Sequence, residues 1–334
     1  MDKMIDCVFA YQNQPEKLLI SSSGGAFLGI AKAFSEKSEK SGYSIYGASW
    51  TDDFKVVHSR VDSFDDCKIF CGSKYVQSDL GDAFKKVEDD LRQKKAVLFT
   101  GTPCQIGAIR MFLEKHDCNI ERLLLIDIAC HGTPQAFLWY EYKTWLEKKE
   151  KSKLTAFSFR YKPQGWKGYP VMAEFENGHR YENDFQTSHY MTMFRKDLIM
   201  KQCCFKCKYP GNYQSDITIA DFWGVELCMP HIPAKNGVSL LLCHTEKGKN
   251  YSVDIGATKV PDNGYLRYNQ NLSACTVKPA EYDLFWREYK EKGLEFVLKK
   301  YGGNTVKGKL LFNSVKLMRD SGIIAIGKKI LKKA

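Results

Sequence analysis

Residues 95–113 read KAVLFTGTPCQIGAIRMFL, and the order of residue types in this stretch decides the fold. Lys95–Thr100 is a short, largely apolar run, which is typical of a strand buried on both faces of a parallel sheet. It breaks at Gly101-Thr102-Pro103-Cys104, and a helix is predicted over Gln105–Leu113. Strand, tight turn and helix in this order predict the first half of a crossover connection.

The same order of elements recurs directly afterwards. Leu123–Ala129 is a second apolar strand, which breaks at Cys130-His131-Gly132-Thr133-Pro134 before a predicted helix over Gln135–Lys148. Two such units in succession imply a parallel sheet with crossover helices. Ligands of such sheets bind at the carboxyl ends of the strands. Cys104 and Cys130 are therefore both expected at the ligand-binding edge.

The remaining segments complete the predicted fold class, which is α/β with a mainly parallel sheet, crossover helices, an antiparallel β insertion and a helical C-terminal region. Val8–Ile20 is predicted to be mostly extended, with an interruption at Pro15. Alternating segments within Lys151–Asp184 and the turn at Asn177-Gly178 predict the insertion. Four regions follow: an α/β cofactor-binding region (1–150), a β insertion and helix (151–200), a cysteine-motif region returning to the core (201–260), and a helical C-terminal region with a basic tail (261–334).

Composition and charge narrow the class of protein. The chain has 334 residues, of which 44% are apolar and 27% charged, as in an ordinary globular protein. No signal-peptide pattern and no run of ~20 apolar residues is present, so a cytoplasmic location is expected. In that reducing compartment the 12 cysteines are expected to be ligands, catalytic thiols or buried apolar residues rather than disulfides.

The net charge of +11 is concentrated near the C-terminus, where Val306–Ala334 carries eight Lys or Arg against one acid. No basic stripe with interleaved aromatic residues crosses the rest of the chain, so a nucleic-acid partner is not expected. Apolar residues at helical spacing in the tail predict a basic amphipathic segment. We expect its first half to pack on the protein and the half after Gly322 to contact an acidic partner or, peripherally, a membrane surface.

The cysteines form one recognisable constellation. Cys204-Phe205-Lys206-Cys207 is a CxxC, whose turn can direct two thiolates at one metal centre. Together with Cys104 and Cys130 at the sheet edge it makes four thiols, the number that a 4Fe–4S cluster requires. Zinc accepts the same four, and Cys104 and Cys130 can also be buried small apolar residues. The spacing alone leaves these three alternatives open.

Three turns are suited to anions. Ser22, Ser23, Gly24 and Gly25 precede a predicted helix, whose N-terminus favours negative charge, although an ordinary serine N-cap is the commoner meaning of such a loop. Gly101-Thr102-Pro103 is a second phosphate-sized turn. Lys74, after Gly72-Ser73, can supply a positive charge to a pyrophosphate. No GxGxxG follows the first strand, so the nicotinamide-type fingerprint is absent.

A few further side chains have both a functional and a structural interpretation. Asp221 and Trp223 follow an apolar strand and can line a cofactor pocket or serve as a cap and a core residue. Arg160, Lys162 and Trp166 can bind an anionic substrate or form a solvated strand face. His131, beside Cys130, is the candidate catalytic residue, because it can donate to a flavin or relay a proton, or it can be structural.

Six stretches together resemble the coenzyme F-420 hydrogenase/dehydrogenase beta-subunit family. They occur in the family's order: Ser22–Phe27 (SSGGAF), Gly72–Ser78 (GSKYVQS), Val97–Gly107 (VLFTGTPCQIG), Asp127–Thr133 (DIACHGT), Cys204–Tyr209 (CFKCKY) and Ser215–Gly224 (SDITIADFWG). The resemblance implies a flavin- and 4Fe–4S-dependent oxidoreductase that passes electrons between FAD and the cluster. It implies Cys104, Cys130, Cys204 and Cys207 as ligands, with flavin contacts from the serine–glycine loop, Ser73, Lys74, Gly101 and Thr102.

The chain departs from many relatives at its start, where only Cys7 precedes Ser21 and no ferredoxin-like cysteine run occurs. Electrons are therefore expected to arrive from a separate ferredoxin-like carrier or subunit. The resemblance does not fix the substrate, for which coenzyme F-420 and another deazaflavin or flavin are candidates. Similar bacterial proteins occur near surface-polysaccharide genes, which makes service in that biosynthesis a further implication. The alternative is a zinc-stabilised or accessory non-redox subunit that keeps the family scaffold.

Overall fold

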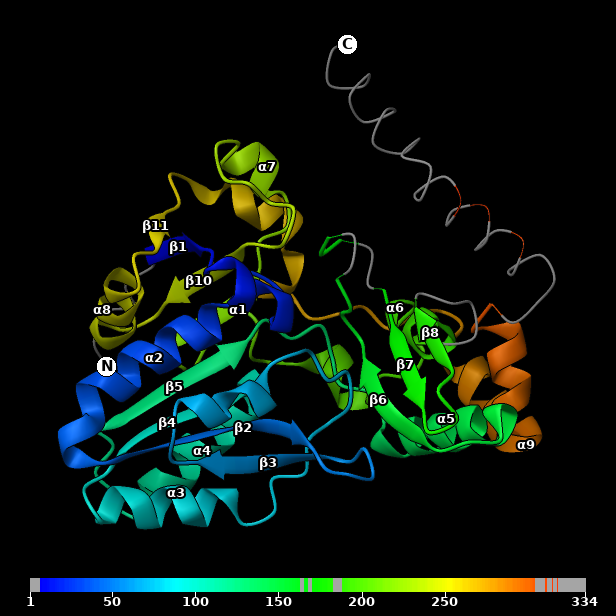
Figure 1. Ribbon diagram of the computed structural model, residues 1–334, viewed down its shortest axis with the longest axis horizontal. Coiled ribbons are helices and arrows are strands. Elements are labelled where there is room, and N and C mark those ends of the chain that lie inside the picture. The colour runs from blue at the N-terminus through cyan, green and yellow to red at the C-terminus, as the bar shows by residue number, and fades with distance from the viewer. Residues whose placement is uncertain are drawn as a thin grey trace. The chain divides into compact units, whose positions relative to one another are not determined.

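The two apolar runs form neighbouring parallel strands inside an eight-stranded mixed sheet. The computed structural model describes residues 7–162, 165–167, 170–182, 188–303, 310, 314 and 317, and the sheet is counted within these. In spatial order its strands are β11 (Thr258–Lys259), β1 (Cys7–Tyr11), β10 (Ser239–Cys243), β9 (Ile217–Asp221), β5 (Leu123–Ile128), β4 (Ala96–Gly101), β2 (Tyr43–Trp50) and β3 (Val56–Val61). Figure 1 shows the strands and the helices around them.

Strand direction divides this sheet into a parallel centre and antiparallel flanks. Strands β2, β4, β5 and β9 run parallel, with Gly101 opposite Asp127 and Asp127 opposite Thr218. β3 is antiparallel to β2, and β10, β1 and β11 continue the other flank with antiparallel pairs. The crossover from β4 through the helix Pro103–Lys115 to β5 is thus confirmed, whereas the helix Ala136–Glu150 after β5 belongs to a second compact unit. The antiparallel pairing of β10 with β1 was not predicted, because the local sequence pattern does not reveal it.

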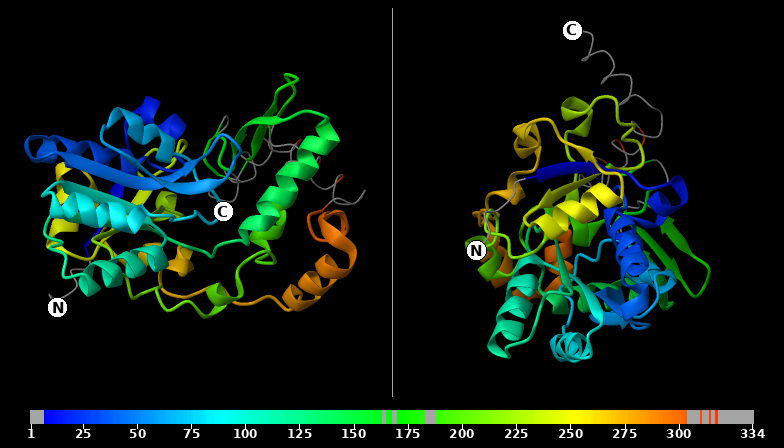
Figure 2. Two further views of the ribbon diagram at one scale, coloured as in Figure 1. Left: turned by 90° about the horizontal axis from the view of Figure 1, so that it is seen from below. Right: turned by 90° about the vertical axis from the view of Figure 1, so that its left-hand side faces the viewer.

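Helices cover both faces of the large sheet (Figure 2). Its α-helices and the 3₁₀ helices used below are α1 (Pro15–Ile20), α2 (Ala26–Ser38), η2 (Asp65–Phe70), α3 (Ala83–Arg92), α4 (Pro103–Lys115), η3 (Gln202–Lys206), α7 (Val225–Cys228), α8 (Glu246–Asp254), η4 (Asn263–Tyr268) and η5 (Gln270–Leu272). Ile30 and Phe34 of α2 pack with Leu124 and Ile126 of β5 on one face. Ile106 and Ile109 of α4 pack with the opposite face.

The start of the chain differs from the prediction. Pro15–Ile20 is helical rather than extended, and Pro15 occupies the first turn of α1. Proline is favoured there because its fixed φ suits a helix and its missing N–H would have no partner within the helix. Pro15 therefore begins a helix instead of interrupting a strand.

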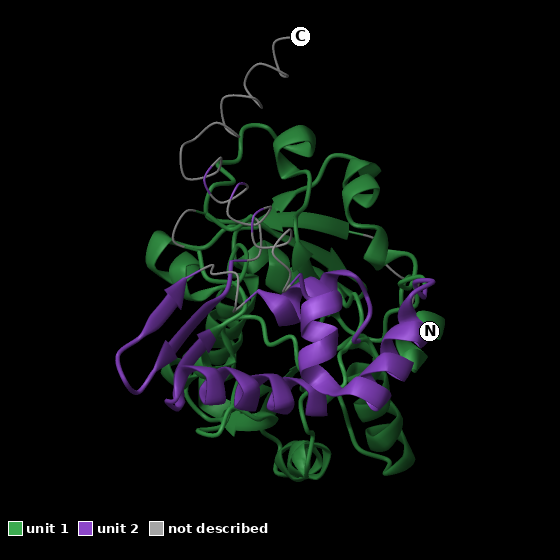
Figure 3. Cartoon of the chain, turned by 90° about the vertical axis from the view of Figure 1, so that its right-hand side faces the viewer, with its two compact units in different colours: residues 1–136, 158–169, 200–277 green, residues 137–157, 170–199, 278–334 purple. Residues whose placement is uncertain are grey.

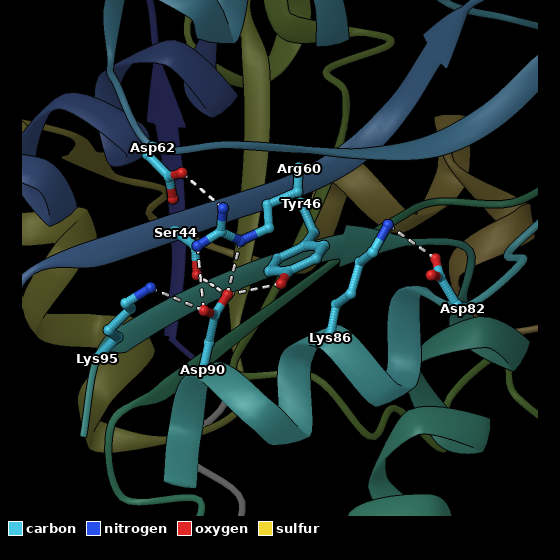
Figure 4. A network of polar contacts seen from close by, with 8 residues as sticks. All are labelled: Ser44, Tyr46, Arg60, Asp62, Asp82, Lys86, Asp90 and Lys95. Atoms are coloured by element: carbon cyan, nitrogen blue, oxygen red, sulfur yellow. Dashed lines mark hydrogen bonds and ion pairs between the residues drawn. The ribbon is translucent and has the colours of Figure 1, made fainter. Parts of the chain in front are cut away.

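A buried acid ties α3 to the sheet (Figure 4). The carboxylate of Asp90 accepts hydrogen bonds from the hydroxyls of Ser44 and Tyr46, both at 2.6 Å, and from Nε of Arg60 at 2.8 Å. Burial by itself would raise the pKa of Asp90, but these hydrogen bonds outweigh it and hold the pKa well below its usual range. The network satisfies a charge that would otherwise destabilise the core.

The chain divides into two compact units, shown in different colours in Figure 3. Unit 1 comprises residues 1–136, 158–169 and 200–277, and unit 2 comprises residues 137–157, 170–199 and 278–334. These units are drawn by compactness, whereas the four regions above follow the character of the sequence, so that division stays a prediction.

Unit 2 contains most of the predicted insertion and the C-terminal helix α9. Its elements are α5 (Ala136–Glu150), β6 (Leu154–Ser158), β7 (Met172–Phe175), β8 (Arg180–Glu182), α6 (His189–Arg195) and α9 (Tyr282–Lys300). β6, β7 and β8 form a three-stranded sheet in which β7 and β8 are antiparallel. The antiparallel insertion is confirmed. Apart from Leu310, Ser314 and Leu317, the basic segment from Val306 lies outside the described residues, so its predicted contacts stay predictions. Among the described helices, none has the length and apolar character that crossing a bilayer requires.

Candidate functional site

The turn after β4 begins α4 at the carboxyl edge of the sheet. Thr102 and Gln105 form a capping box, in which Gln105 Oε1 accepts from the backbone N–H of Thr102 at 2.9 Å. With Pro103 in the first turn, this arrangement determines where the helix begins. Cys104 is left exposed in that first turn, and its Sγ lies 3.2 Å from the hydroxyl of Thr102.

The structure brings the four predicted cysteines together within unit 1. Burial, together with the charges of Cys104, Cys204 and Cys207, raises the pKa of the Cys130 thiol to about 12. Cys104 also raises the pKa of Cys204 and of Cys207, again after burial. Such charge effects fall off with distance, so the four thiols are neighbours, although the chain separates the first from the last by about a hundred residues.

Backbone N–H groups point at three of these sulfurs. The N–H of Thr133 donates to Cys204 Sγ at 3.4 Å, and those of Gly132 and Tyr209 donate to Cys130 and Cys207. Gly132 has φ +141°, and a Cβ there would lie 2.9 Å from Met200 Sδ, so glycine allows this close turn. Hydrogen bonds to sulfur stabilise thiolates and tune the potential of an iron–sulfur centre.

The donor set suits an iron–sulfur centre in its chemistry, because it consists of thiols with N–H donors around them. Zinc also takes four thiolates, so it stays an alternative. In the described ranges, no group of three or more His, Cys, Asp or Glu side chains is already arranged to hold a metal ion. The assignment of Cys104, Cys130, Cys204 and Cys207 as ligands therefore stays a prediction.

Two further cysteines lie beside this group. Cys203 is exposed and hydrogen-bonds to Cys204, and both Cys203 and Cys275 raise the pKa of Cys207. Cys275 Sγ lies 3.5 Å from the carbonyl oxygen of Phe205. Cys203 is recognisable in the sequence as a neighbour of the CxxC. Cys275 carries no motif, and only the fold brings it here.

The serine–glycine loop lies at the same sheet edge, before α2. The hydroxyl of Ser23 donates to the carbonyl of Val238 at 2.8 Å. A Cβ on Gly24 would lie 2.2 Å from the carbonyl oxygen of Tyr11 and 2.3 Å from the backbone nitrogen of Ser239. Gly25 adopts φ +75° at the N-cap of α2. Glycine is thus required at Gly24 by close backbone packing and favoured at Gly25 by the left-handed turn.

The segment 72–78 links the serine–glycine loop to the turn before α4. At one end Ser22 Oγ accepts from the backbone N–H of Ser73 at 2.6 Å and lies 2.8 Å from its hydroxyl. At the other end Gln105 donates to Ser78 Oγ at 2.9 Å. From Ser73 to Ser78 the chain can span at most about 18 Å. The segment 72–78 therefore connects two of the three predicted anion-suited turns.

Lys74, in the segment 72–78, directs its ammonium group to backbone oxygens. Nζ donates to the carbonyls of Phe70, Cys71 and Gly72 at 3.3, 3.0 and 3.2 Å. Burial lowers the pKa of Lys74 to about 8, and the nearby Cys71 opposes this slightly. A flavin phosphate would have to compete with these carbonyls for the amine.

Asp221 is held by an ion pair that sequence reasoning did not foresee. Its carboxylate lies 2.8 Å from Nη1 of Arg160, whose side chain is buried. Arg160 also donates to the carbonyls of Ser22 and Trp166, each at 3.3 Å. Trp166 stacks on Trp223 with ring centroids 4.5 Å apart. Arg160 therefore connects Asp221 to the serine–glycine loop, and it is not part of a solvated strand face.

His131 is exposed, and its carbonyl accepts a hydrogen bond from the hydroxyl of Thr276. This contact orients the backbone of His131 rather than its ring. The catalytic assignment of His131 stays a prediction.

Asp127 is a buried acid that sequence reasoning passed over. It is 0% exposed, and the hydroxyls of Thr218 and Ser215 are its hydrogen-bonding neighbours. Burial raises its pKa to about 7, although the nearby hydroxyls of Thr218 and Ser215 act in the opposite direction. An acid near the end of the apolar run Leu123–Ile128 is the signal that could have identified it.

A cleft of about 700 Å³ lies elsewhere in unit 1, beside α1, α2 and the end of α8. Its lining includes Tyr11, Lys17, Lys32, Glu36 and Asp254, but none of the predicted site residues. The cysteines and the serine–glycine loop, rather than this cleft, carry the chemistry that the sequence indicates.

Comparisons with known proteins identify the family and the fold of the chain. A family model that describes the C terminus of the coenzyme F420 hydrogenase/dehydrogenase beta subunit matches residues 94–260, half of the chain. No curated protein matches significantly. Among solved structures, the chain is similar to one from the xenon-derivatised F420-reducing [NiFe] hydrogenase complex of Methanosarcina barkeri, with a TM-score of 0.50 and 16% identity over 91% of this chain and 92% of that one. At this identity the likeness concerns the fold, and it confirms the predicted α/β class.

Proposed function

Because the chain belongs to the coenzyme F420 hydrogenase/dehydrogenase beta-subunit family, we propose that it is a flavin- and 4Fe–4S-dependent electron-transfer oxidoreductase. Cys104, Cys130, Cys204 and Cys207 would hold the cluster. When bound, the flavin would convert two-electron hydride chemistry into single-electron steps that the cluster conducts. The protein's part is to bind the two groups, orient them and tune the sulfurs.

The observation that carries the proposal is the convergence of four thiols from three separate loops, three of them facing backbone N–H donors. Burial raises the pKa of three of these thiols, and a bound cation-rich centre would stabilise the thiolate form that the N–H donors also favour. A purely structural role would not need N–H donors directed at the sulfurs.

The flavin would lie along the segment 72–78, between Ser22 and Thr102. The loop Ser22–Gly25 offers backbone N–H groups at the start of α2. Ser73 and Thr102 offer hydroxyl groups at the two ends of this segment. Asp221 would contribute through its ion pair with Arg160, which holds the serine–glycine loop in place. Lys74 would serve the phosphates after exchanging its carbonyl partners.

The electron donor would be a separate ferredoxin-like carrier or subunit, and the substrate would be coenzyme F-420 or another deazaflavin or flavin. The fold match to a chain of a hydrogenase complex supports work in company with other subunits. A cytoplasmic location and service in surface-polysaccharide biosynthesis are parts of the same proposal.

Anaerobic purification with iron, sulfide, zinc and flavin analysis tests the proposal. We expect brown protein with about four irons per chain and bound FAD. Changing Cys104, Cys130, Cys204 or Cys207 singly to Ser should remove most of the iron, whereas Cys118→Ser, which is outside the group, should not. Zinc in place of iron, without colour, would support the zinc-stabilised alternative. Iron without flavin uptake would contradict the flavin half.

A further inference from the structure

Buried polar side chains connect three neighbouring strands of unit 1. Asp127 of β5 lies opposite Thr218 of β9 in the parallel register, and the Thr218 hydroxyl is a hydrogen-bonding neighbour of the Asp127 carboxylate. Oγ1 of Thr218 also lies 2.8 Å from Nε2 of His244, the residue that follows β10. Asp127 and Thr218 are 0% exposed, and His244 is 7% exposed. The three side chains therefore form one continuous polar connection inside the protein.

The chemistry of the three groups fixes the direction of these hydrogen bonds. An ionised carboxylate only accepts, so the Thr218 hydroxyl donates to Asp127. Because this uses the one hydroxyl proton, the Thr218 oxygen accepts from His244, which then carries its proton on Nε2. Nδ1 of His244 is left as an acceptor, and it has no hydrogen-bond partner in the described ranges. A proton that arrives at Nδ1 can therefore be passed on to Asp127.

The connection extends from the neighbourhood of the cysteines toward solvent. The charges of Asp127 and Cys130 both raise the pKa of Tyr213, so both groups lie near its ring. His244 stacks on the same ring, with centroids 4.7 Å apart. At the outer end, His244 is followed after one residue by Glu246, which is exposed at the start of α8.

No fixed positive charge compensates Asp127. In the part of the chain that the structure describes, no ion pair includes Asp127, and no Lys or Arg shifts its pKa. The carboxylate of nearby Asp216 accepts instead from the N–H of Leu125 and the hydroxyl of Thr245. Burial lowers the pKa of His244 to about 4 and keeps the ring neutral. The remaining titratable neighbours are Tyr213 and, around that ring, Tyr265 and Cys130.

We propose that Asp127 is the internal proton acceptor of the redox centre, and that His244 and Thr218 deliver its proton. This inference rests on the proposed function, because it needs a redox centre at the cysteines. An electron that enters from the donor adds negative charge near Asp127, which favours the protonated carboxyl group.

The transfer takes one proton from water for each electron. That proton binds Nδ1 of His244, the Nε2 proton moves to the oxygen of Thr218, and the hydroxyl proton of Thr218 moves to the Asp127 carboxylate. His244 remains neutral, with its proton now on Nδ1. The net change is one electron on the centre and one proton on Asp127, so the charge of this part of the core is unchanged.

Redox titration of the full-length, iron-loaded protein tests the role of Asp127. The midpoint potential of the wild-type centre, followed by electron paramagnetic resonance, should fall as pH rises from about 6 to about 9, because reduction takes up a proton. Asp127→Asn should lose most of this dependence. The control Asp52→Asn, at an exposed turn, should behave as wild type. Equal pH dependence in Asp127→Asn and wild type would overturn the role of Asp127.

The rate of proton uptake tests the path. Reduced methyl viologen delivers electrons without protons, and an indicator dye in weakly buffered solution reports the protons taken up. Thr218→Val removes the hydroxyl between Asp127 and His244 and should slow uptake at least about tenfold. Ser215→Ala is the matched control, since it removes a hydroxyl that also neighbours Asp127 but lies outside the connection to His244. Equal rates in these two variants would overturn the relay.

One measurement needs no variant. Infrared difference spectra of the wild-type protein, reduced minus oxidised, should gain a protonated carboxyl band that shifts in heavy water. Absence of this band would overturn the proposal even if Asp127→Asn failed to bind iron. Failure of the wild-type protein to contain a reducible iron centre would instead count against the proposed function.

Discussion

Asp127 has the least aqueous surroundings of the acids in the site. It lies near the end of β5, three residues before Cys130, and the hydroxyls of Thr218 and Ser215 do not offset the cost of burying its charge. Its neighbours are hydroxyl groups and the ring of Tyr213, whose pKa is raised by burial and then by the charge of Asp127.

Asp127→Asn is expected to stabilise the protein increasingly as pH rises. The pKa of Asp127 is raised above its unfolded value of 3.8, so the folded state holds the proton more tightly and stability is lost between pH 4 and 7. The difference in unfolding free energy between variant and wild type should grow by about 2 to 3 kcal/mol from pH 5 to pH 8. Urea denaturation under anaerobic conditions measures it. Asp52→Asn, at an exposed turn, is the control, and parallel pH curves for wild type and Asp127→Asn would contradict the expectation.

At the scale of elements, the short motifs were predictable and the long-range pairings were not. The geometry of the turn Gly101–Cys104 could be predicted from its residues, because Thr102, Pro103 and Gln105 each strongly prefer one position at the start of a helix. The prediction of an extended segment around Pro15 was wrong, because proline is compatible both with the interruption of a strand and with the beginning of a helix. The pairing of β1 with β10 joins residues more than two hundred positions apart, and nothing in either strand identifies the other.

Thr102→Ala should loosen the start of α4. Removing the cap is expected to lower the unfolding free energy by about 1 kcal/mol. It also removes the hydroxyl beside Cys104 Sγ, so iron should be lost faster to a chelator. Thr102→Ser keeps the oxygen and is the control. Equal stability and equal iron loss in the Ala and Ser variants would show that the capping box is not what positions Cys104.

At the scale of the whole molecule, the cysteine site is built from distant segments of unit 1. Cys104 and Cys130 come before the segments of unit 2, whereas Cys204 and Cys207 come after residues 170–199. Sequence reasoning named these four residues because each lies in a recognisable motif. It could not include Cys275, or the ion pair between Arg160 and Asp221, because tertiary packing alone sets these contacts.

A centre that joins such distant segments should stabilise the fold. Because a bound metal centre stabilises only the folded state, its removal is expected to lower the melting temperature by about 10 °C, which corresponds to several kcal/mol for a unit of this size. Calorimetry before and after anaerobic chelation measures the shift. Cys204→Ser should already melt at the lower temperature and should not respond to the chelator. An unchanged melting temperature on iron removal would mean that the thiols are held together without the centre.

The pairing of β1 with β10 has a consequence for biosynthesis. β1 ends at Tyr11, and its neighbour in the sheet begins only at Ser239. At ribosomal rates of about 5 to 20 residues per second, the nascent chain carries β1 without this partner for roughly 10 to 45 s. Cys204 and Cys207 also leave the ribosome late, so the set of thiols proposed to hold the cluster is incomplete for most of translation. A chaperone that shields the first strand would therefore act before any factor that delivers the cluster.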